Sequence, residues 1–374
     1  MASGFAINPD DGVRIGWETF GSDDARRTIV FLPTWSIVHS RIWKLQVPYF
    51  AQHGFRVVTF DGRGNGRSDR PKSGYTTEHF VADLLAVLDT LDIHEALFVG
   101  FSAGARWGIQ LAAEHPERVI RLALIAPAAR FSESPENMVQ FLEAPPNREG
   151  FNKYNAVHWR EDYVDFLQWF FSEISNEPHS TKQIEDGVNW GLETNPEILI
   201  PTITERLTPR LRELAAAVRC PTLIIHGTND TIIPIAVGRE VHSIIPNSQL
   251  VEMQGNGHAP HTRDPVATNQ LLHDFFGREV PAERTRTRAM SRPKRALFVS
   301  SPIGLGHAQR DVAIADELRQ LVPGLEIDWL AQHPVTSVLS ARGEHIHPLS
   351  CRLAGESPHI ESQMSGEHEL NVFQ

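Results

Sequence analysis

Short runs of β-branched and aromatic residues alternate with helical patterns along most of the chain. The strand-like runs lie at residues 28–32, 56–60, 96–99, 122–126, 222–226 and 249–253. The clearest helical patterns lie at residues 77–91 and 105–114. Strands that alternate with helices are typical of a mostly parallel sheet with helices on its faces. We therefore expect an α/β fold.

Two further features shape the predicted domain. Near the amino terminus, apolar runs at residues 13–17 and 28–32 flank a turn-type cluster, which predicts a hairpin that feeds a buried strand. Between about residues 131 and 212 the chain has aromatic-rich helical stretches and no strong strand pattern. We predict a helical cap at residues 131–212, inserted in a domain that spans residues 1–277.

The pentapeptide Gly100-Phe101-Ser102-Ala103-Gly104 lies directly after one strand-like run and before a helical run. A G-x-S-x-G pattern in this context holds its serine on a sharp, strained turn between strand and helix. The turn brings the residues on either side of the serine too close for side chains, and glycine meets that need. The pattern predicts Ser102 as a nucleophile.

A serine hydroxyl is a weak nucleophile at neutral pH, so a base must accept its proton and a third group must orient that base. Asp230 lies in the loop after the strand-like run at residues 222–226. His258 lies in a glycine-containing loop after the run at residues 249–253. We predict His258 as the base and Asp230 as the acid that orients it, with His261 as the alternative base.

The chain order serine, acid, histidine is the order found in α/β-hydrolases. Residues 61–71, with the sequence DGRGNGRSDRP, also resemble the D-x-R-G-x-G-x-S stretch that follows an early strand in this family. The chain thus resembles the serine hydrolases of the α/β-hydrolase fold over about residues 10–277, and the resemblance implies that fold with a helical cap. We interpret Asp61 and Arg63 as structural anchors of the glycine-rich loop.

Acyl transfer also needs two backbone N–H groups directed at the developing oxyanion. Ala103 is predicted to supply one of them, and the loop after residues 28–32 the other. Many members of the family have a His-Gly pair in that loop, whereas this chain has Pro33-Thr34 followed by Trp35. We predict the N–H of Trp35 as the second donor, and its indole as either a wall of the pocket or a buried structural group.

A serine nucleophile separates the chain from epoxide hydrolases and haloalkane dehalogenases, which resemble it in the cap but use aspartate at this position. Serine predicts attack on the carbonyl of an ester, a thioester or a ketone, and the resemblance to cofactor-free perhydrolases implies peracid formation as a side activity. We predict a hydrolase that acts on a carboxylic ester or a related carbonyl substrate. The aromatic residues of the predicted cap would suit an apolar or ring-bearing small molecule, or they only pack the cap on the core. A small-molecule receptor and an acyltransferase on the same fold are the alternatives.

The carboxyl-terminal part of the chain has a different organisation. Residues 278–293 are rich in arginine and lack apolar periodicity, which predicts an exposed basic linker. A strand, a helix and a second strand are predicted beyond it, at residues 296–300, 310–321 and 325–330. We therefore expect a small βαβ unit within residues 294–374.

The turn Ile303-Gly304-Leu305-Gly306-His307 resembles the G-x-G-H turn of glycosyltransferases that are built from two Rossmann-like domains. In that family a histidine near this turn acts as the base, and His307 matches it. Residues 294–374 do not include the donor-binding half of such an enzyme. We therefore predict a truncated fragment without transferase activity.

Composition bears on partners and location. The formal net charge is −11 and acidic residues are spread along the chain, so we expect no nucleic-acid partner. Cys220 and Cys351 lie far apart, and we expect no disulfide framework, no metal and no cofactor. Residues 1–11 lack a secretory pattern and no stretch approaches the length of a membrane span, so we expect a cytoplasmic protein. The oligomeric state stays open.

Overall fold

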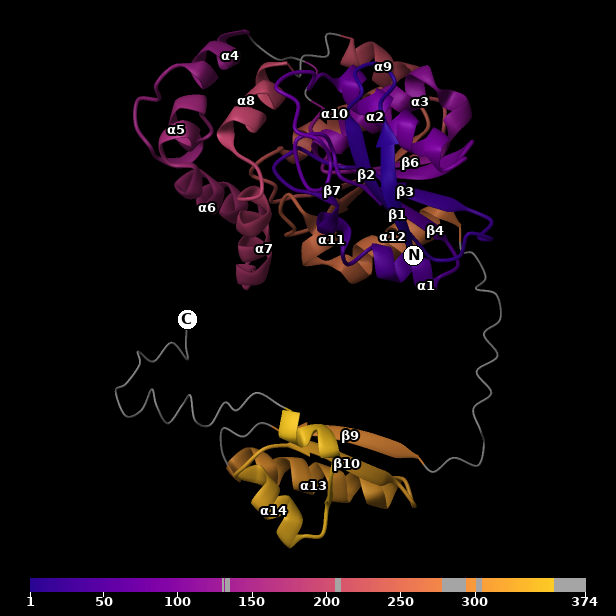
Figure 1. Cartoon of the computed structure of the whole chain (residues 1–374), viewed down its shortest axis with the longest axis vertical. Coiled ribbons are helices and arrows are strands. Elements are labelled where there is room, and N and C mark those ends of the chain that lie inside the picture. Colours follow the sequence, from indigo (N-terminus) through magenta and orange to yellow (C-terminus); the bar gives the residue numbers. More distant parts are fainter. Residues whose placement is uncertain (130, 132–134, 206–209, 278–293, 301–304, 353–374) are drawn as a thin grey trace. The chain divides into compact units, whose positions relative to one another are not determined.

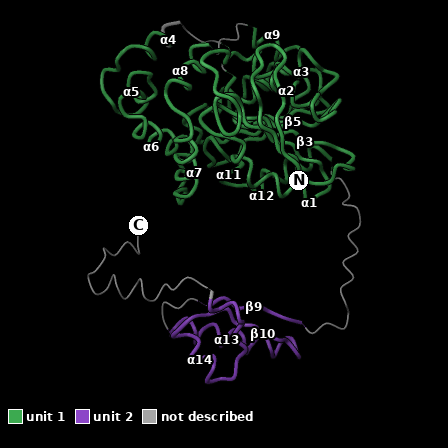
Figure 2. The backbone as a smooth tube through the Cα atoms, in the orientation of Figure 1, with its two compact units in different colours: residues 1–284 green, residues 285–374 purple. Residues whose placement is uncertain are grey.

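The computed structural model of the chain describes residues 1–129, 131, 135–205, 210–277, 294–300 and 305–352. The chain forms two compact units, Met1–Arg284 and Thr285–Gln374, and each is described by itself (Figure 2). The predicted basic linker at residues 278–293 lies outside the described residues, as do residues 303 and 304 of the predicted G-x-G-H turn.

The first unit is built on an eight-stranded sheet with the strand order β1-β2-β4-β3-β5-β6-β7-β8 (Figure 1). β1 and β2 run antiparallel to their neighbours, whereas the strands from β4 to β8 run parallel to one another. The strands are β1 (Ala2–Ile7), β2 (Arg14–Phe20), β3 (Thr28–Phe31), β4 (Arg56–Phe60), β5 (Ala96–Phe101), β6 (Val119–Ile125), β7 (Thr222–Gly227) and β8 (Ser248–Met253). The predicted α/β class with a mostly parallel sheet is confirmed.

The predicted opening hairpin is wrong. β2 does form a hairpin, but its partner is β1, which sequence reasoning missed, and not β3. On its other side β2 pairs with β4, so β4 separates β2 from β3 in the sheet. A turn-type cluster marks a change of direction but does not say which strand becomes the neighbour, because distant strands compete for the same edge.

The central strands are apolar throughout because helices cover both faces of the sheet. Neighbouring residues of β3 point to opposite faces: Val30 packs in one hydrophobic cluster and Phe31 in the other. Helices that cover the first face are α2 (Thr77–Thr90), α3 (Ala103–Glu114), α9 (Leu211–Ala217) and α10 (Ile235–Ile244). Helices α1 (Val47–Gln52) and α12 (Pro265–Phe276) cover the second face.

Between β6 and α9 the described chain is helical, and Figure 1 shows these helices grouped to one side of the sheet. We call them the insertion helices: α4 (Pro135–Leu142), α5 (Ala156–Glu161), α6 (Tyr163–Ile174), α7 (Thr181–Gly191) and α8 (Pro196–Thr204). Their aromatic residues pack on one another, as in the pair Trp159 and Phe166 with ring centroids 4.6 Å apart. The insertion helices join the hydrophobic cluster on the second face of the sheet.

The contacts of Asp61 and Arg63 suit the structural role expected of them. The carboxylate of Asp61 accepts hydrogen bonds from the backbone N–H groups of Ser40 and Arg67, each at 2.9 Å. The fully buried guanidinium of Arg63 donates to both carboxylate oxygens of Asp83, at 2.7 and 2.6 Å. Such a bidentate pair satisfies a charge that would be costly to bury alone.

The second unit has a three-stranded parallel sheet of order β11-β10-β9. Its elements are β9 (Arg295–Ser300), α13 (Leu305–Leu321), β10 (Glu326–Ala331), α14 (Val335–Ala341) and β11 (His345–Ile346). The predicted βαβ unit is present, and β11 adds a strand that sequence reasoning missed because it has only two residues. His307 lies in the first turn of α13 and is exposed.

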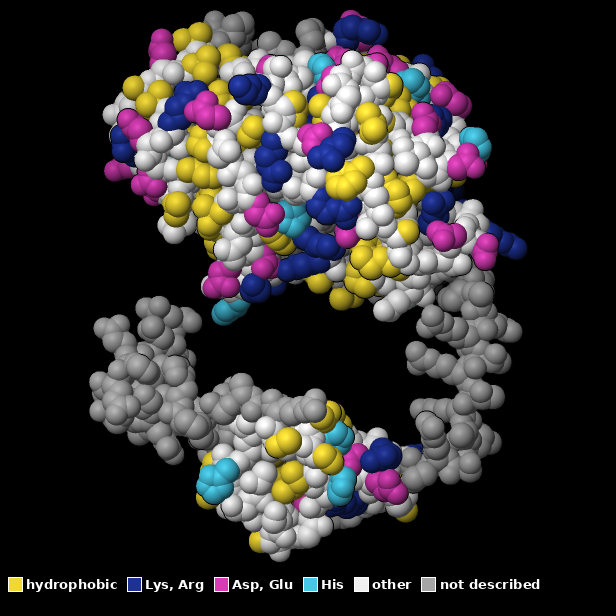
Figure 3. Space-filling model, in the orientation of Figure 1, with side chains coloured by type: hydrophobic (Ala, Val, Ile, Leu, Met, Phe, Trp, Pro, Cys, Tyr) yellow, Lys and Arg dark blue, Asp and Glu magenta, His cyan; other side chains and the backbone are white. Residues whose placement is uncertain are grey.

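Side chains of both charge signs are interspersed over the face of the first unit that Figure 3 shows. Exposed ion pairs of this unit include Arg14 with Asp69 at 3.0 Å and Arg160 with Glu197 at 2.8 Å. Exposed pairs of this kind contribute little to stability. Among the helices of the described residues, none combines the length and apolar character that crossing a bilayer requires.

Candidate active site

Ser102 occupies the turn between β5 and α3. Its φ of 52° is a left-handed conformation that is strained for a residue with a side chain. Backbone hydrogen bonds hold the turn: the N–H of Ser102 donates to the carbonyl of Ile125 at 2.9 Å, and its carbonyl accepts from the N–H of Ala128 at 3.0 Å. Hydrogen bonds to β6 and to the loop that follows it therefore keep Ser102 in its strained conformation.

Both glycines of the pentapeptide are required by close backbone approach. A Cβ on Gly100 would lie 2.6 Å from the carbonyl oxygen of Gly104. A Cβ on Gly104 would overlap the carbonyl oxygen of Pro33. Any larger residue at either position would push the turn away from β3 or from α3.

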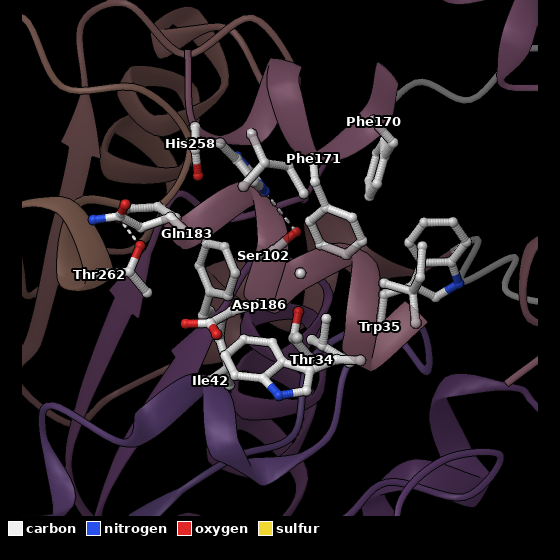
Figure 4. A pocket seen from close by; sticks show the side chains of 18 of the residues that line it. Thr34, Trp35, Ile42, Ser102, Phe170, Phe171, Gln183, Asp186, His258 and Thr262 are labelled. Carbon is white, nitrogen blue, oxygen red and sulfur yellow. Dashed lines mark hydrogen bonds between the residues drawn. The ribbon is translucent and has the colours of Figure 1, made fainter. Parts of the chain in front are cut away.

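His258 lies in the loop between β8 and α11 (Pro260–Arg263). Its Nε2 is 3.0 Å from the Oγ of Ser102, and its Nδ1 is 2.8 Å from Oδ2 of Asp230. Figure 4 shows His258 and Ser102 facing each other at the pocket. The structure thus brings together the three residues that the sequence placed in separate loops.

His261, the alternative base, lies elsewhere. Its ring is fully buried beside Phe101 and Trp43, with ring centroids 4.5 and 4.8 Å away. Within the described residues, neither ring nitrogen of His261 has a hydrogen-bond partner. The geometry favours His258 over His261 as the base.

The carboxylate of Asp230 accepts hydrogen bonds from two backbone N–H groups and from two histidines. Oδ1 accepts from the backbone N–H groups of Ile232 and Ile233, at 2.9 and 2.8 Å. Oδ2 accepts from His258 and also from His226, whose Nε2 is 3.1 Å away. Because Oδ2 accepts the proton on Nδ1 of His258, Nε2 of that ring is left to accept the proton of Ser102.

These contacts set the charge of Asp230. Burial by itself raises the pKa of a carboxyl group, but the charge of His258 and the hydrogen bonds from His226, His258 and Ile233 outweigh it. The pKa of Asp230 is therefore held well below its ordinary value. The carboxylate stays ionised at neutral pH, as a group that orients a histidine must.

His226 is a contributor that sequence reasoning missed. It is the last residue but one of β7 and lies four residues before Asp230. Its Nε2 also lies 2.8 Å from the carbonyl oxygen of Ile233, so this nitrogen is a donor. A Cβ on Gly238 of α10 would overlap the ring, so glycine there makes room for it. A histidine near the end of a strand and shortly before a loop aspartate was the available signal.

The loop that carries Trp35 is anchored from two sides. On one side, the hydroxyl of Ser36 donates to the carbonyl of Arg63 at 2.7 Å, and the amide of Asn65 donates to the carbonyl of Ser36 at 2.8 Å. On the other side, the indole Nε1 of Trp35 donates to Oγ1 of Thr202 in α8 at 2.6 Å. These contacts hold the loop without the His-Gly pair that many members of the family have.

The indole of Trp35 also packs against insertion residues, which include Tyr154, Trp159 and Phe170. The half-buried indole is thus part of an aromatic cluster and also lines the space beside Ser102. It stays a prediction that the backbone N–H groups of Ala103 and Trp35 donate hydrogen bonds to the oxyanion.

Two cavities border Ser102. The first, of about 250 Å³, is lined by His258 but not by Ala103, and we call it the His258 cavity (Figure 4). The second, of about 280 Å³, is lined by Ala103 but not by His258, and we call it the Ala103 cavity. Trp35 and Phe170 line both. Trp190, which was not among the predicted site residues, also lines the His258 cavity.

His261 makes stability depend on pH. Burial lowers its pKa from 6.5 to about 3, so the unfolded chain binds a proton that the folded chain refuses as the pH falls below 6.5. The folded state should lose about 2 kcal/mol of stability between neutral pH and about pH 5 from this group alone. Urea unfolding of wild type and His261→Leu at the two pH values measures the loss.

The variant His261→Leu should lose less stability on acidification than wild type, by about the same 2 kcal/mol. His94→Leu is the matched control, because the side chain of His94 is 92% exposed. Equal acid destabilisation of wild type and His261→Leu would mean that His261 is protonated in the folded protein.

Comparison with known proteins places this site in a family. Residues 27–265 match the family described as alpha/beta hydrolase fold. The AB hydrolase superfamily protein YisY of Bacillus subtilis is 27% identical over 73% of this chain and 98% of its own length. The non-heme chloroperoxidase of Burkholderia pyrrocinia is 28% identical over 72% of this chain and 98% of its own length.

Solved structures agree. The enol-lactonase of Burkholderia xenovorans LB400 superposes with a TM-score of 0.62 at 27% identity, and covers 71% of this chain and 97% of its own. The esterase EaEST of Exiguobacterium antarcticum superposes with a TM-score of 0.63 over 72% of this chain and 97% of the esterase chain. At 21% identity this similarity supports the fold alone. The chain belongs to the α/β-hydrolase fold family and is a hydrolase.

Proposed function

We propose that this hydrolase cleaves carboxylic esters of apolar small molecules through an acyl-enzyme on Ser102. The observation that carries the proposal is the continuous contact from Ser102 Oγ to His258 Nε2 at 3.0 Å and from His258 Nδ1 to Asp230 at 2.8 Å. A serine, a histidine in the correct tautomer and an ionised carboxylate in this order are what nucleophilic acyl transfer needs.

In the first half-reaction Ser102 Oγ attacks the carbonyl carbon while its proton moves to Nε2 of His258. The N–H groups of Ala103 and Trp35 stabilise the negative oxygen, an effect worth about 3 kcal/mol for one such donor. The bond to the leaving oxygen then breaks and His258 gives that oxygen its proton. In the second half-reaction water attacks the acyl carbon while His258 takes its proton. The bond from that carbon to Oγ of Ser102 then breaks, Oγ takes the proton from His258, and the carboxylic acid is released.

The site also supports a division of the chain. We propose that residues 1–277 form the hydrolase domain, with the insertion helices as its cap, because these helices supply Phe170 and Trp190 to the wall of the His258 cavity. The resemblance of residues 294–374 to a glycosyltransferase fragment stays a prediction, and we propose no activity for it.

The test is a burst assay with p-nitrophenyl esters of increasing acyl length, followed by intact-mass spectrometry. We expect wild type to release about one nitrophenolate per enzyme in a fast phase and to gain the mass of one acyl group, because the acyl-enzyme accumulates when deacylation is slower. No release and no adduct, with a ligand that still raises the unfolding temperature, would favour a receptor.

A further inference from the structure

Ser102 lies between two cavities that differ in which part of the catalytic machinery they expose. We infer that the His258 cavity binds the leaving alcohol of the ester and the Ala103 cavity binds its acyl group. The inference rests on the proposed ester hydrolysis and adds to it the direction in which the substrate lies. It predicts esters of apolar alcohols or phenols as substrates.

The path of the proton carries this assignment. In the tetrahedral intermediate the carbon holds Oγ of Ser102, the oxyanion, the leaving oxygen and the acyl carbon. His258 holds the proton that came from Ser102, and the leaving oxygen must take it as its bond to carbon breaks. The leaving oxygen therefore lies on the side of His258 Nε2, and His258 lines one cavity and not the other.

The acyl group is then assigned by elimination, because Ser102 borders two cavities and the leaving oxygen takes the one on the side of His258. Ala103 follows the nucleophile and lines only the Ala103 cavity. When the oxyanion faces Ala103 and Trp35 and the leaving oxygen faces His258, the acyl carbon takes the remaining direction. The acyl group stays bonded to Ser102 while the alcohol departs, so a separate cavity for each allows the alcohol to leave before water enters.

Trp35 and Phe170 form the wall between the cavities. Their ring centroids are 5.3 Å apart with an interplanar angle of 86°, an edge-to-face contact, and both rings line both cavities. The hydrogen bond from Trp35 Nε1 to Thr202 at 2.6 Å fixes one side of this wall to α8. The wall therefore keeps the two substrate groups apart instead of leaving one shared space.

The lining of the His258 cavity indicates which alcohol fits. Its walls are mostly apolar side chains from the core and the insertion helices, and they include Val38, Ile42, Phe170, Phe171, Ile174 and Trp190. Three charged residues also line it, Asp186, Lys44 and Lys182, but their charges pair: the carboxylate of Asp186 contacts both lysines, at 2.8 Å for Lys182. An apolar alkyl or ring-bearing alcohol suits these walls better than a charged one.

Two isomeric esters test the assignment: octyl acetate has its long chain on the alcohol, and methyl nonanoate has it on the acyl group. The half-buried Ile174 lines only the His258 cavity, and the half-buried Ala128 lines only the Ala103 cavity. The measured quantity is the ratio of kcat/KM for octyl acetate to kcat/KM for methyl nonanoate. Each rate is measured from the proton that the acid product releases.

Ile174→Trp should lower this ratio about ten-fold or more, and Ala128→Leu should raise it by a similar factor, because each fills one cavity. Val164→Trp, on the same helix as Ile174 but 46% exposed and outside both cavities, should keep the wild-type ratio. Thermal unfolding of each variant checks its fold, and the ratio cancels any loss of active enzyme.

The opposite pattern, with a raised ratio in Ile174→Trp and a lowered one in Ala128→Leu, would overturn the inference and place the acyl group beside His258. Unchanged ratios in both variants would also overturn it. In these cases wild type still hydrolyses esters and the proposed function stands. If wild type hydrolyses neither these isomers nor p-nitrophenyl esters, the proposed function fails and the inference with it.

Discussion

Ser102→Ala should lower kcat on p-nitrophenyl esters by about 10⁶-fold, because the variant has no nucleophile and the remaining groups cannot form an acyl-enzyme. Steady-state release of nitrophenolate measures the loss, and the intact mass should show no acyl adduct. The variant should fold normally, since the hydrogen bonds of the turn use the backbone of residue 102 and not its hydroxyl.

Ser172→Ala is the control for this result. The hydroxyl of Ser172 is exposed and donates to the carbonyl of Trp169 within α6, outside both cavities. We expect kcat within about two-fold of wild type, because the substitution touches neither cavity and a surface change of this kind leaves the stability of the fold nearly unchanged. Retained turnover and a retained adduct in Ser102→Ala would move the nucleophile to another residue.

Much of the fold could be predicted because its signals are local. The buried central strands are continuous apolar runs such as ALFVGF in β5, and helices cover them on both faces. The position of β1 could not be predicted, since Ala6 is the one buried residue of Ala2–Ile7, and the strand joins the edge of the sheet by pairing with β2. Pairing is a long-range property that the strand itself does not encode.

The same distinction applies to the site. Ser102, Asp230 and His258 each follow a strand, and parallel strands end at the same edge of the sheet, so their meeting could be expected from the sequence. The cavity walls could not. Phe170 and Phe171 of α6 both pack in the core and both line the His258 cavity. A helical pattern shows that an aromatic residue faces inward, but it does not show whether that residue also borders a cavity.

The position of Asp230 explains why its charge cannot be replaced by a similar shape. An asparagine would offer one oxygen and one NH2 group where the carboxylate accepts four hydrogen bonds. With the NH2 group at Oδ1 it would face the N–H groups of Ile232 and Ile233. With the NH2 group at Oδ2 it would face His226 and turn His258 to the tautomer that carries its proton on Nε2.

Asp230→Asn should therefore lower kcat on p-nitrophenyl esters by about 10⁴-fold, because His258 in the wrong tautomer cannot accept the proton of Ser102. Asp165→Asn is the matched control: Asp165 also contacts a histidine, His158 at 3.0 Å, but lies in α6 outside both cavities. The kcat of the Asp165→Asn variant should stay within a few-fold of the wild-type value. If Asp230→Asn retained more than about a tenth of the wild-type rate, the carboxylate would not orient His258, and the base would owe its tautomer to another contact.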